Sequence, residues 1–325
     1  MSSQKLIPLI LITLCTLALL VGFVNSIMNP DVKIASRNPL DNKIALIKLS
    51  GVIQESQDSG LFAETYSAEN TKKNLEKALE DPTVKGIILK INSPGGTVAQ
   101  SQELYNTVLK VRKTKPVFVS MGDVAASGGY YIASAADRIY ACPGTLTGSI
   151  GVIFNAPDAS VLLNNKLGIK SQVIKSGKYK DIGSPSRPMN ADEKELLTGI
   201  IQNSYGQFLN AITKGRIERQ DAYKTPKTNL TEQNLTTYSD GRIFTGEQAK
   251  TLGFVDEVGV LDDAYLAINK LISPHKKLPL VPYNKANSFS DLFMNMQESL
   301  APKDLTKTMI PFSIEHSHKL LYIWE

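Results

Sequence analysis

The sequence predicts an α/β fold built on parallel strands, and three observations support this prediction. Short apolar segments bounded by turn residues alternate with longer segments of helical periodicity from residue 44 onward. The connections between successive apolar segments are long enough to hold a helix, as parallel pairing requires. The 325 residues are 42% hydrophobic and 21% charged, which suits a sizeable core and excludes a disordered or wholly membrane-embedded chain.

The chain begins with an apolar segment. Residues 6–24 carry no charge and are long enough to cross a bilayer as a helix, so residues 1–28 are expected to form one transmembrane anchor. A cleavable signal peptide, cut near residues 24–26, is the alternative, but the apolar run exceeds the usual length of such a core. Flanking charges are nearly balanced and do not predict an orientation. The polar residues 29–43 are expected to be a linker.

Three apolar segments are expected to form the centre of the sheet, at residues 44–49, 84–91 and 116–121. Helices are expected between them at residues 68–80 and 98–112. The dipeptide Asp81-Pro82 ends the first of these helices, since a proline cannot continue it.

The second half of the pattern contains shorter elements. Strands are expected at residues 138–141, 150–154 and 169–174, and a helix at residues 158–167. A long helix opens at Asn190, where Glu193 completes a capping box. Its apolar residues recur at helical spacing and are expected to face the core: Leu197, Ile200, Ile201, Tyr205, Phe208, Leu209 and Ile212. Helices near residue 245 and at residues 261–271 complete a domain of residues 44–273, and residues 274–325 are expected to be a packed C-terminal extension.

A serine lies between the third strand and the next helix, in the motif Ala125-Ala-Ser-Gly-Gly-Tyr-Tyr131. A serine hydroxyl is a poor nucleophile until a neighbouring base takes its proton, and histidine is the usual base. The chain has no histidine before His275, so an activated Ser127 needs another base, and lysine is the known variant. Desolvation lowers the pKa of a lysine and makes it a usable base.

Three lysines compete for that role in the loop after residue 174, namely Lys175, Lys178 and Lys180. Their spacing does not identify the one that turns inward. Ser149 is the best-placed hydroxyl to hold a neutral lysine, although a turn serine bonded to its local backbone has the same appearance.

Adjacent glycines predict an oxyanion hole. In the turn Ser93-Pro-Gly-Gly96 the missing side chains let backbone N–H groups approach a reacting oxygen. We expect Gly96 to donate one N–H, with Gly95 a close alternative. The N–H of Gly128, directly after the serine, would be the second donor.

Five motifs occur in the order seen in the signal peptide peptidase A (protease IV) family, which the chain resembles from about residue 44 to 271. They are Asn92-Ser-Pro-Gly-Gly96, Ala125 to Tyr131, Leu146-Thr-Gly-Ser-Ile-Gly151, Ser176-Gly-Lys-Tyr-Lys-Asp181 and Gly241-Arg-Ile-Phe-Thr-Gly-Glu-Gln-Ala249. The resemblance implies a crotonase-like or Clp-protease-like parallel β superhelix with flanking helices. It also implies a serine/lysine dyad.

Carried over by position, the resemblance makes Ser127 the nucleophile, Lys180 the general base and Ser149 the residue that orients this base. It gives the oxyanion hole to Gly96 and Gly128. The chain resembles the short, single-repeat form of the family. That form implies a homo-oligomer in which Ser127 and Lys180 of one site come from adjacent subunits.

The resemblance further implies a peptidase that degrades released signal peptides. It would be held in the cytoplasmic (inner) membrane by a single span, with its catalytic domain on the extracytoplasmic side. No cofactor is implied, and His316 and His318 lack acidic or cysteine partners at metal-ligand spacing. The charge of +5 is spread along the chain, so no nucleic-acid partner is expected. Two alternatives stay open: a crotonase-like enzyme acting on an acyl thioester, and a catalytically idle membrane scaffold.

Overall fold

A computed structural model describes residues 41–55, 66–219, 223, 225–226, 228–283 and, for the backbone alone, 321–323. The expected anchor at residues 1–28, most of the linker and His316 and His318 lie outside these residues. Within the described ranges, no helix combines the length and the apolar composition that a membrane span needs.

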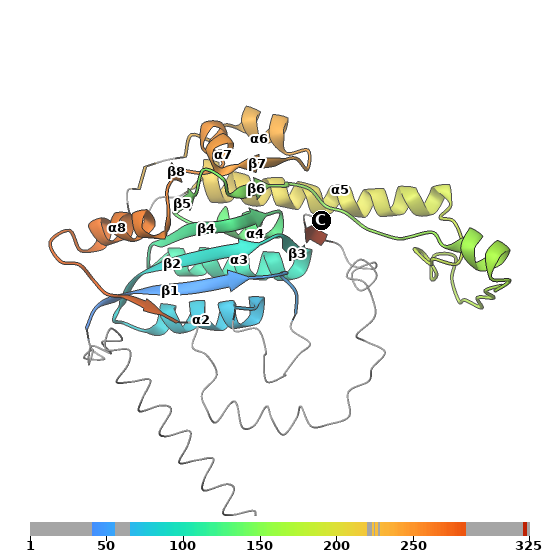
Figure 1. Cartoon of the computed structure of the whole chain (residues 1–325), viewed down its shortest axis with the longest axis horizontal. Helices are drawn as coiled ribbons and strands as arrows, with labels where there is room; N and C mark the ends of the chain where they lie inside the picture. The colour runs from blue at the N-terminus through green and yellow to red at the C-terminus, as the bar shows by residue number, and fades with distance from the viewer. Residues whose placement is uncertain are drawn as a thin grey trace, which may run out of the picture. The chain divides into compact units, whose positions relative to one another are not determined.

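An eight-stranded, mostly parallel sheet organises the chain from Asn42 onward (Figure 1). Its longest strands pair in the order β1 (Lys43–Ser50), β2 (Val84–Ser93) and β4 (Val117–Ala126). Shorter strands extend it: β9 (Leu280–Pro282) beside β1, and β5 (Arg138–Ala141), β6 (Leu146–Gly148), β7 (Ile243–Thr245) and β8 (Glu257–Val258) beyond β4. The pairings are parallel except that of β7 with β6. The parallel sheet predicted from the connection lengths is confirmed.

One edge of β4 pairs with two strands in succession. Its first half pairs with β5, where Phe118 lies opposite Arg138, and its last residues pair with β6, where Ala126 lies opposite Gly148. On the other edge, Ala125 lies opposite Ser93 of β2. The carboxyl end of β4 is therefore held on both sides.

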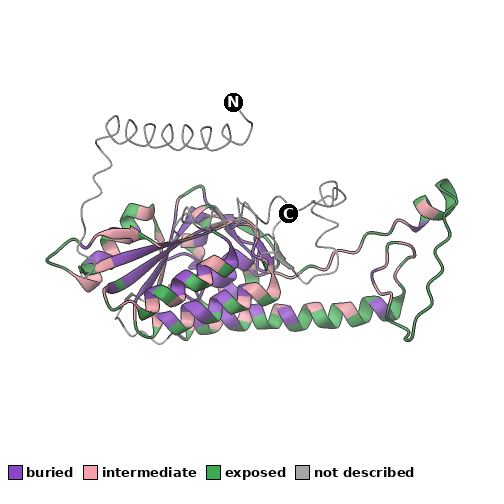
Figure 2. Cartoon of the chain, turned by 90° about the horizontal axis from the view of Figure 1, so that it is seen from below, coloured by how far each residue is buried: buried purple, intermediate pink, exposed green. Residues whose placement is uncertain are grey.

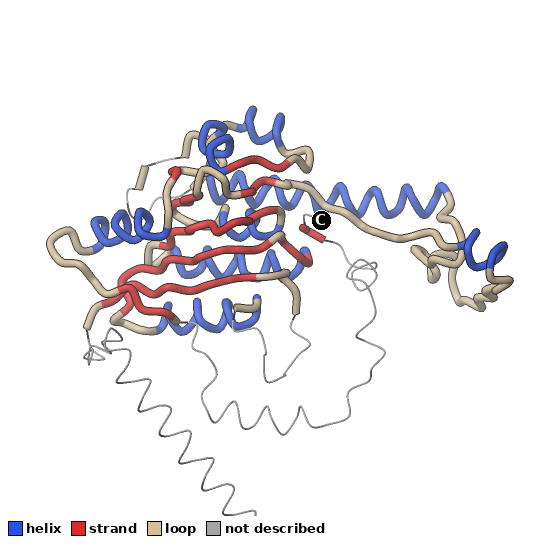
Figure 3. The backbone as a smooth tube through the Cα atoms, in the orientation of Figure 1, coloured by secondary structure: helices blue, strands red, loops and turns tan. Residues whose placement is uncertain are grey.

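Helices cover both faces of the sheet (Figures 1 and 3). One face carries α2 (Ala68–Glu80), α3 (Val98–Arg112) and α4 (Gly128–Ala133), and the other carries α8 (Leu261–Ile272). Alternate residues of β1 enter the two layers, since Ala45 and Ile47 join the first core and Ile44 and Leu46 pack in the α8 layer. The remaining elements are β3 (Gly95–Thr97), η2 (Thr213–Ile217), α6 (Glu232–Tyr238), α7 (Gly246–Leu252) and β10 (Leu321–Ile323).

Local capping signals explain why several predicted boundaries are confirmed. The helices predicted at residues 68–80 and 98–112 coincide with α2 and α3. The Ser67 hydroxyl accepts a hydrogen bond from the N–H of Asn70 at the start of α2. At the start of the long helix, Asn190 and Glu193 exchange the predicted capping-box bonds, at 2.9 and 3.0 Å.

Residues 153–200, which we call the arm, extend away from the sheet (Figure 2). The strands predicted at residues 150–154 and 169–174 are wrong, and the helix predicted at 158–167 is a shorter segment that contains the π-helical turn η1 (Leu162–Lys166). Residues 169–174 are exposed and irregular. These residues have the apolar pattern of a strand, but within the described chain no neighbouring strand forms hydrogen bonds with them.

The long helix α5 (Ala191–Ile212) joins the core only at its C-terminal half. Phe208 and Ile212 are fully buried, whereas Ile200 is 41% exposed. The prediction that the whole apolar face enters the core is therefore wrong for the first turns, because the helix is longer than the layer it covers.

We predict that Phe208→Ala lowers the free energy of unfolding by about 3–5 kcal/mol, because it removes a fully buried ring and leaves a cavity. The ring centroid lies 4.8 Å from that of Tyr131 in α4, so this contact fixes α5 to the sheet layer. Denaturant unfolding of the two proteins measures the loss. The exposed neighbour Asn210→Ala is the control, with a change within about 0.5 kcal/mol; equal losses would contradict the prediction.

Candidate active site

Ser127 lies at the carboxyl end of β4, immediately before α4. Its backbone is in the left-handed region, with φ of 52°, a conformation that costs a non-glycine residue roughly 1–3 kcal/mol. The N–H of Ser127 donates to the carbonyl of Gly148, and its own carbonyl accepts from Tyr131, both at 2.8 Å. The side chain is 1% exposed, and its hydroxyl has no hydrogen-bond partner within the described part of the chain. A strained residue with a buried, unpaired hydroxyl points to a functional role.

The three motifs expected at the site meet at one edge of the sheet. The pairing of Ser93 with Ala125 brings the Ser-Pro-Gly-Gly turn beside Ser127, and the bond to Gly148 brings Ser149 to its other side. Carboxyl ends of parallel strands are the usual place for ligand sites in α/β proteins.

Backbone packing explains the glycine at residue 96. The N–H of Ile53 donates to the carbonyl of Gly95, and the N–H of Thr97 donates to the carbonyl of Ile53, both at 2.7 Å. Because backbone groups alternate along a strand, the N–H of Gly96 points away from Ile53 and toward the edge where Tyr322 of β10 lies opposite Gly96. A Cβ at Gly96 would lie 1.9 Å from the Ile53 oxygen, so only glycine fits.

The alternative donor, Gly95, is already engaged. Its N–H donates to the hydroxyl of Ser93 at 3.1 Å. The N–H of Gly128, in contrast, belongs to the first turn of α4 and has no acceptor within that helix. A Cβ at the following Gly129 would lie 3.0 Å from the Ser93 carbonyl, so α4 begins directly against the glycine turn. The two expected donors, Gly96 and Gly128, are thus on neighbouring segments.

Ser149 shares the unusual backbone of Ser127, with φ of 50°. Its N–H donates to the carbonyl of Arg242 at 2.8 Å, and its side chain is 7% exposed. The preceding Gly148 leaves no room for a side chain, since a Cβ there would lie 2.5 Å from the Phe244 ring. Residues 148–149 are therefore held closely beside the serine.

Ion pairs distinguish the three lysines of the arm. The Lys175 amine binds Asp181 at 2.5 Å, and the Lys178 amine pairs with Asp192. The hydrogen bond to Asp192 raises the pKa of Lys178, which opposes a role as a base. Lys180 is exposed, and its amine makes no ion pair or hydrogen bond with the described residues.

The lysine loop lies beyond the N-terminal end of α5, whereas α4, which begins directly after Ser127, packs against the C-terminal half of α5 (Figure 1). Arg187 ties the loop to Glu193 in the first turn, whereas Tyr131 of α4 packs on Phe208. Those two helix positions are about fifteen residues, or roughly 22 Å, apart at about 1.5 Å per residue. A four-carbon lysine stem does not span that distance, so one protomer does not bring Lys180 to its own Ser127.

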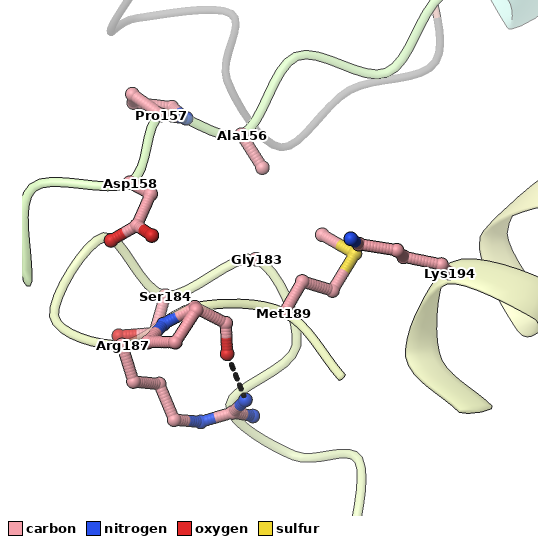
Figure 4. Close-up of a pocket in the computed structure, with 9 residues that line it drawn as sticks. Ala156, Pro157, Asp158, Gly183, Ser184, Arg187, Met189 and Lys194 are labelled. Carbon is pink, nitrogen blue, oxygen red and sulfur yellow. Dashed lines mark hydrogen bonds between the residues drawn. The ribbon is translucent and has the colours of Figure 1, made fainter. Parts of the chain in front are cut away.

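A pocket of about 260 Å³ opens beside the loop (Figure 4). Its lining residues are Ala156, Pro157, Asp158, Gly183, Ser184, Arg187, Pro188, Met189 and Lys194. All of them belong to the arm, so this pocket is not a substrate pocket for Ser127 of the same chain.

Three residues of the C-terminal extension lie at the site. Strand β10 pairs antiparallel with β3, and Tyr322 lies opposite Gly96. The edge of β3 thus accepts an extended backbone segment, which is how several proteins recognise peptides.

Comparison with known proteins assigns the family. The profile of peptidase family S49 matches residues 110–273, and that of Clp protease matches residues 63–146. The chain belongs to peptidase family S49. The Clp protease match agrees with the expected α/β fold of this S49 member.

Several relatives support this membership. A candidate signal peptide peptidase SppA of Enterococcus faecium is 36% identical over 232 residues, which are 71% of this chain and 64% of that protein. A candidate protease of Synechocystis is 39% identical over 68% of this chain and 72% of its own length. The chloroplastic serine protease SPPA of Arabidopsis thaliana is 33% identical over 82% of this chain and 38% of its own length. The S49 chain therefore spans less than two thirds of the first and third of these relatives.

Sequence reasoning missed Arg187 in this S49 member. Its side chain binds Asp181 and Glu193, and no periodic pattern links these three positions. The only signal was a single arginine between two carboxylates in an otherwise polar loop.

We predict that Gly96→Ala abolishes activity and lowers the melting temperature, because a Cβ there would overlap the Ile53 carbonyl and displace β3. Thermal unfolding and peptide hydrolysis measure the two effects. Gly144→Ala is the matched control, since nothing lies within 4 Å of its Cβ position, and we expect it to be neutral or stabilising by up to about 1 kcal/mol. An active Gly96→Ala variant would contradict the geometry.

Proposed function

We propose that this chain is a serine endopeptidase in which Ser127 attacks a peptide carbonyl and Lys180 of an adjacent subunit is the general base. The observation that carries the proposal is the strained, buried Ser127 hydroxyl without a partner in the described chain, beside the N–H groups of Gly96 and Gly128. An acyl-thioester enzyme or an idle scaffold would have no use for such a serine.

The steps follow from these positions. A neutral Lys180 takes the proton of Ser127 as the hydroxyl oxygen bonds to the substrate carbonyl carbon. The N–H groups of Gly96 and Gly128 stabilise the oxyanion. The protonated lysine then gives its proton to the leaving amine as the peptide bond breaks, and water hydrolyses the acyl-enzyme. Ser149, next to Gly148, orients the lysine amine.

Two findings support a site shared between subunits. Glu193, to which Arg187 ties the lysine loop, is roughly 22 Å along α5 from Phe208, which packs on Tyr131 of α4. Of the three lysines, Lys180 makes no ion pair with the described residues. The arm also exposes apolar side chains that a partner would cover: Val161, Leu162, Leu167, Ile169, Val173, Ile174, Leu196 and Ile200. When a lysine of each subunit serves the next, the interface is heterologous and can close into a ring.

The proposed substrates are signal peptides after their release, which are apolar and can be held in an extended form. Support comes from the edge of β3, which pairs with an extended segment in the structure. The apolar residues 6–24 support a single membrane anchor. The placement of the catalytic domain on the extracytoplasmic side of the cytoplasmic membrane rests on the family resemblance. This anchor would keep the site near membrane-embedded peptides.

We predict that Ser127→Ala and Lys180→Ala each lower kcat/KM by at least about 1,000-fold, because each removes one member of the proton-transfer pair. Hydrolysis of a fluorogenic peptide measures the loss, and circular dichroism checks the fold. Lys178→Ala is the matched control in the same loop, and its rate should stay near that of the wild type. Labelling of Ser127 by an acylating probe separates a peptidase from the two alternatives. Substantial activity in either variant would refute the dyad.

We also predict that the two inactive variants complement each other. In oligomers assembled from equal amounts of Ser127→Ala and Lys180→Ala subunits, about a quarter of the sites would combine an intact serine with an intact lysine of the neighbour. Activity near that fraction of wild type is expected once mixed assembly is verified with two affinity tags. Inactive mixed oligomers would place the dyad within one subunit.

A further inference from the structure

Arg187 joins two parts of the arm that are separate in the sequence. Its Nε and one terminal nitrogen donate to the two carboxylate oxygens of Asp181, at 2.9 and 2.8 Å. Both terminal nitrogens donate to the carboxylate of Glu193, at 2.9 and 2.5 Å. A planar guanidinium can bridge two carboxylates in this way, and a lysine cannot.

Both carboxylates occupy positions that matter for Lys180. Asp181 follows Lys180 directly, so fixing its side chain fixes the backbone that carries the lysine. The Glu193 side chain is fully buried, and it also accepts from the N–H of Asn190 as part of the capping box. Arg187 therefore connects the lysine loop to the capped first turn of α5.

The same contacts balance the negative charges of Asp181 and Glu193 in the loop that carries Lys180. Hydrogen bonds from Arg187 and Lys175 hold the pKa of the Asp181 carboxyl well below its usual range, so this group is negative at any working pH. Hydrogen bonds from Arg187 and the backbone of Asn190 lower the pKa of Glu193 to about 2. Two cations thus offset two anions. The other charged groups around the loop are Lys178, paired with Asp192, and Asp158 and Lys194, which line the pocket.

Without Arg187, the loop would keep two carboxylates and one cation, Lys175, to offset them. An uncompensated carboxylate favours the ammonium form of a nearby lysine. A base must be neutral to accept a proton, so a higher pKa leaves less active enzyme at a given pH.

We propose that Arg187 is a positioning residue that fixes the Lys180 loop to the first turn of α5 and neutralises the carboxylate of Asp181, the residue that follows the base in the chain. The inference rests on the proposed function, in which Lys180 is the general base.

The test is the pH profile of kcat/KM for the full-length enzyme with a fluorogenic peptide. We expect Arg187→Gln to lower kcat/KM by about 10- to 100-fold, since the lysine is less well placed. We also expect the rising limb of the pH profile of Arg187→Gln to move to higher pH by roughly half to one unit, because the charge of Asp181 is less well compensated. A merely structural loss would lower the rate without moving the limb.

Two further variants separate charge from geometry. Arg187→Lys keeps the charge but cannot bridge both carboxylates, so its limb should stay at the wild-type pH while kcat/KM remains about 10-fold lower. Arg187→Gln combined with Asp181→Asn removes one charge of each sign, and its limb should return to the wild-type pH with the rate still reduced. Lys194→Gln is the matched control, because it removes a positive charge from the same turn and contacts neither Asp181 nor Glu193; its profile should be unchanged.

Each outcome decides between the proposals. If Lys180→Ala is inactive but Arg187→Gln has a wild-type rate and profile, the positioning role is overturned and the dyad stands. If Lys180→Ala is active, the dyad itself fails. Should Arg187→Gln not assemble, the profiles of Arg187→Lys and of the double variant decide, and a shifted limb in Arg187→Lys would overturn the charge argument.

Discussion

The hydrogen bond from the Ser127 N–H to the Gly148 carbonyl joins the two strands on which the site depends. It holds β4 against β6 where the two strands end, and the residues that follow them, Ser127 and Ser149, both have a positive φ. Such backbone strain persists only where the surroundings determine the conformation. Here Ser149 is fixed in turn by the carbonyl of Arg242 on the next segment. The position of Ser127 therefore depends on the backbone contacts along the whole sheet edge.

The core and the arm contribute different parts of the site. The core supplies the serine, the glycine turn and the start of α4, all buried and held by parallel pairing. The arm supplies a lysine loop tied to the first turn of α5 by Arg187. Because α5 is a rigid helix packed on the core at Phe208, it keeps these two parts at a fixed separation. Under the proposed function, this separation means that the serine of one subunit and the lysine loop of another form one site.

Local signals predicted the fold of the core well. A cap at Ser67 and the Asp81-Pro82 stop act within a few residues of the chain, so α2 could be read from the sequence with its ends. The glycine turn and the serine motif were also readable, because they meet through strand order alone. The arm was not. Residues 169–174 have the apolar pattern of a strand, and such a pattern does not say what covers it. The sequence could not separate the three lysines, because the ion pairs of Lys175 with Asp181 and of Lys178 with Asp192 depend on how the loop folds back on α5.

Lys180 is exposed in the single subunit, whereas a lysine that acts as a base must be shielded from water. Under the proposed function, assembly would provide that shielding. A lysine in water is protonated at neutral pH, and only desolvation or nearby positive charge makes it a base. In the isolated arm the loop is open to solvent, and Ile174 just before it is fully exposed while Tyr179 beside the lysine is 40% exposed. A neighbour that covers these apolar side chains would also exclude water from Lys180. Under the proposed function, burial of the arm would thus bring the base to the serine and remove it from water in the same step. We therefore expect peptide hydrolysis only from assembled subunits, because the arm of a free subunit holds the lysine loop away from the part of α5 that packs on α4.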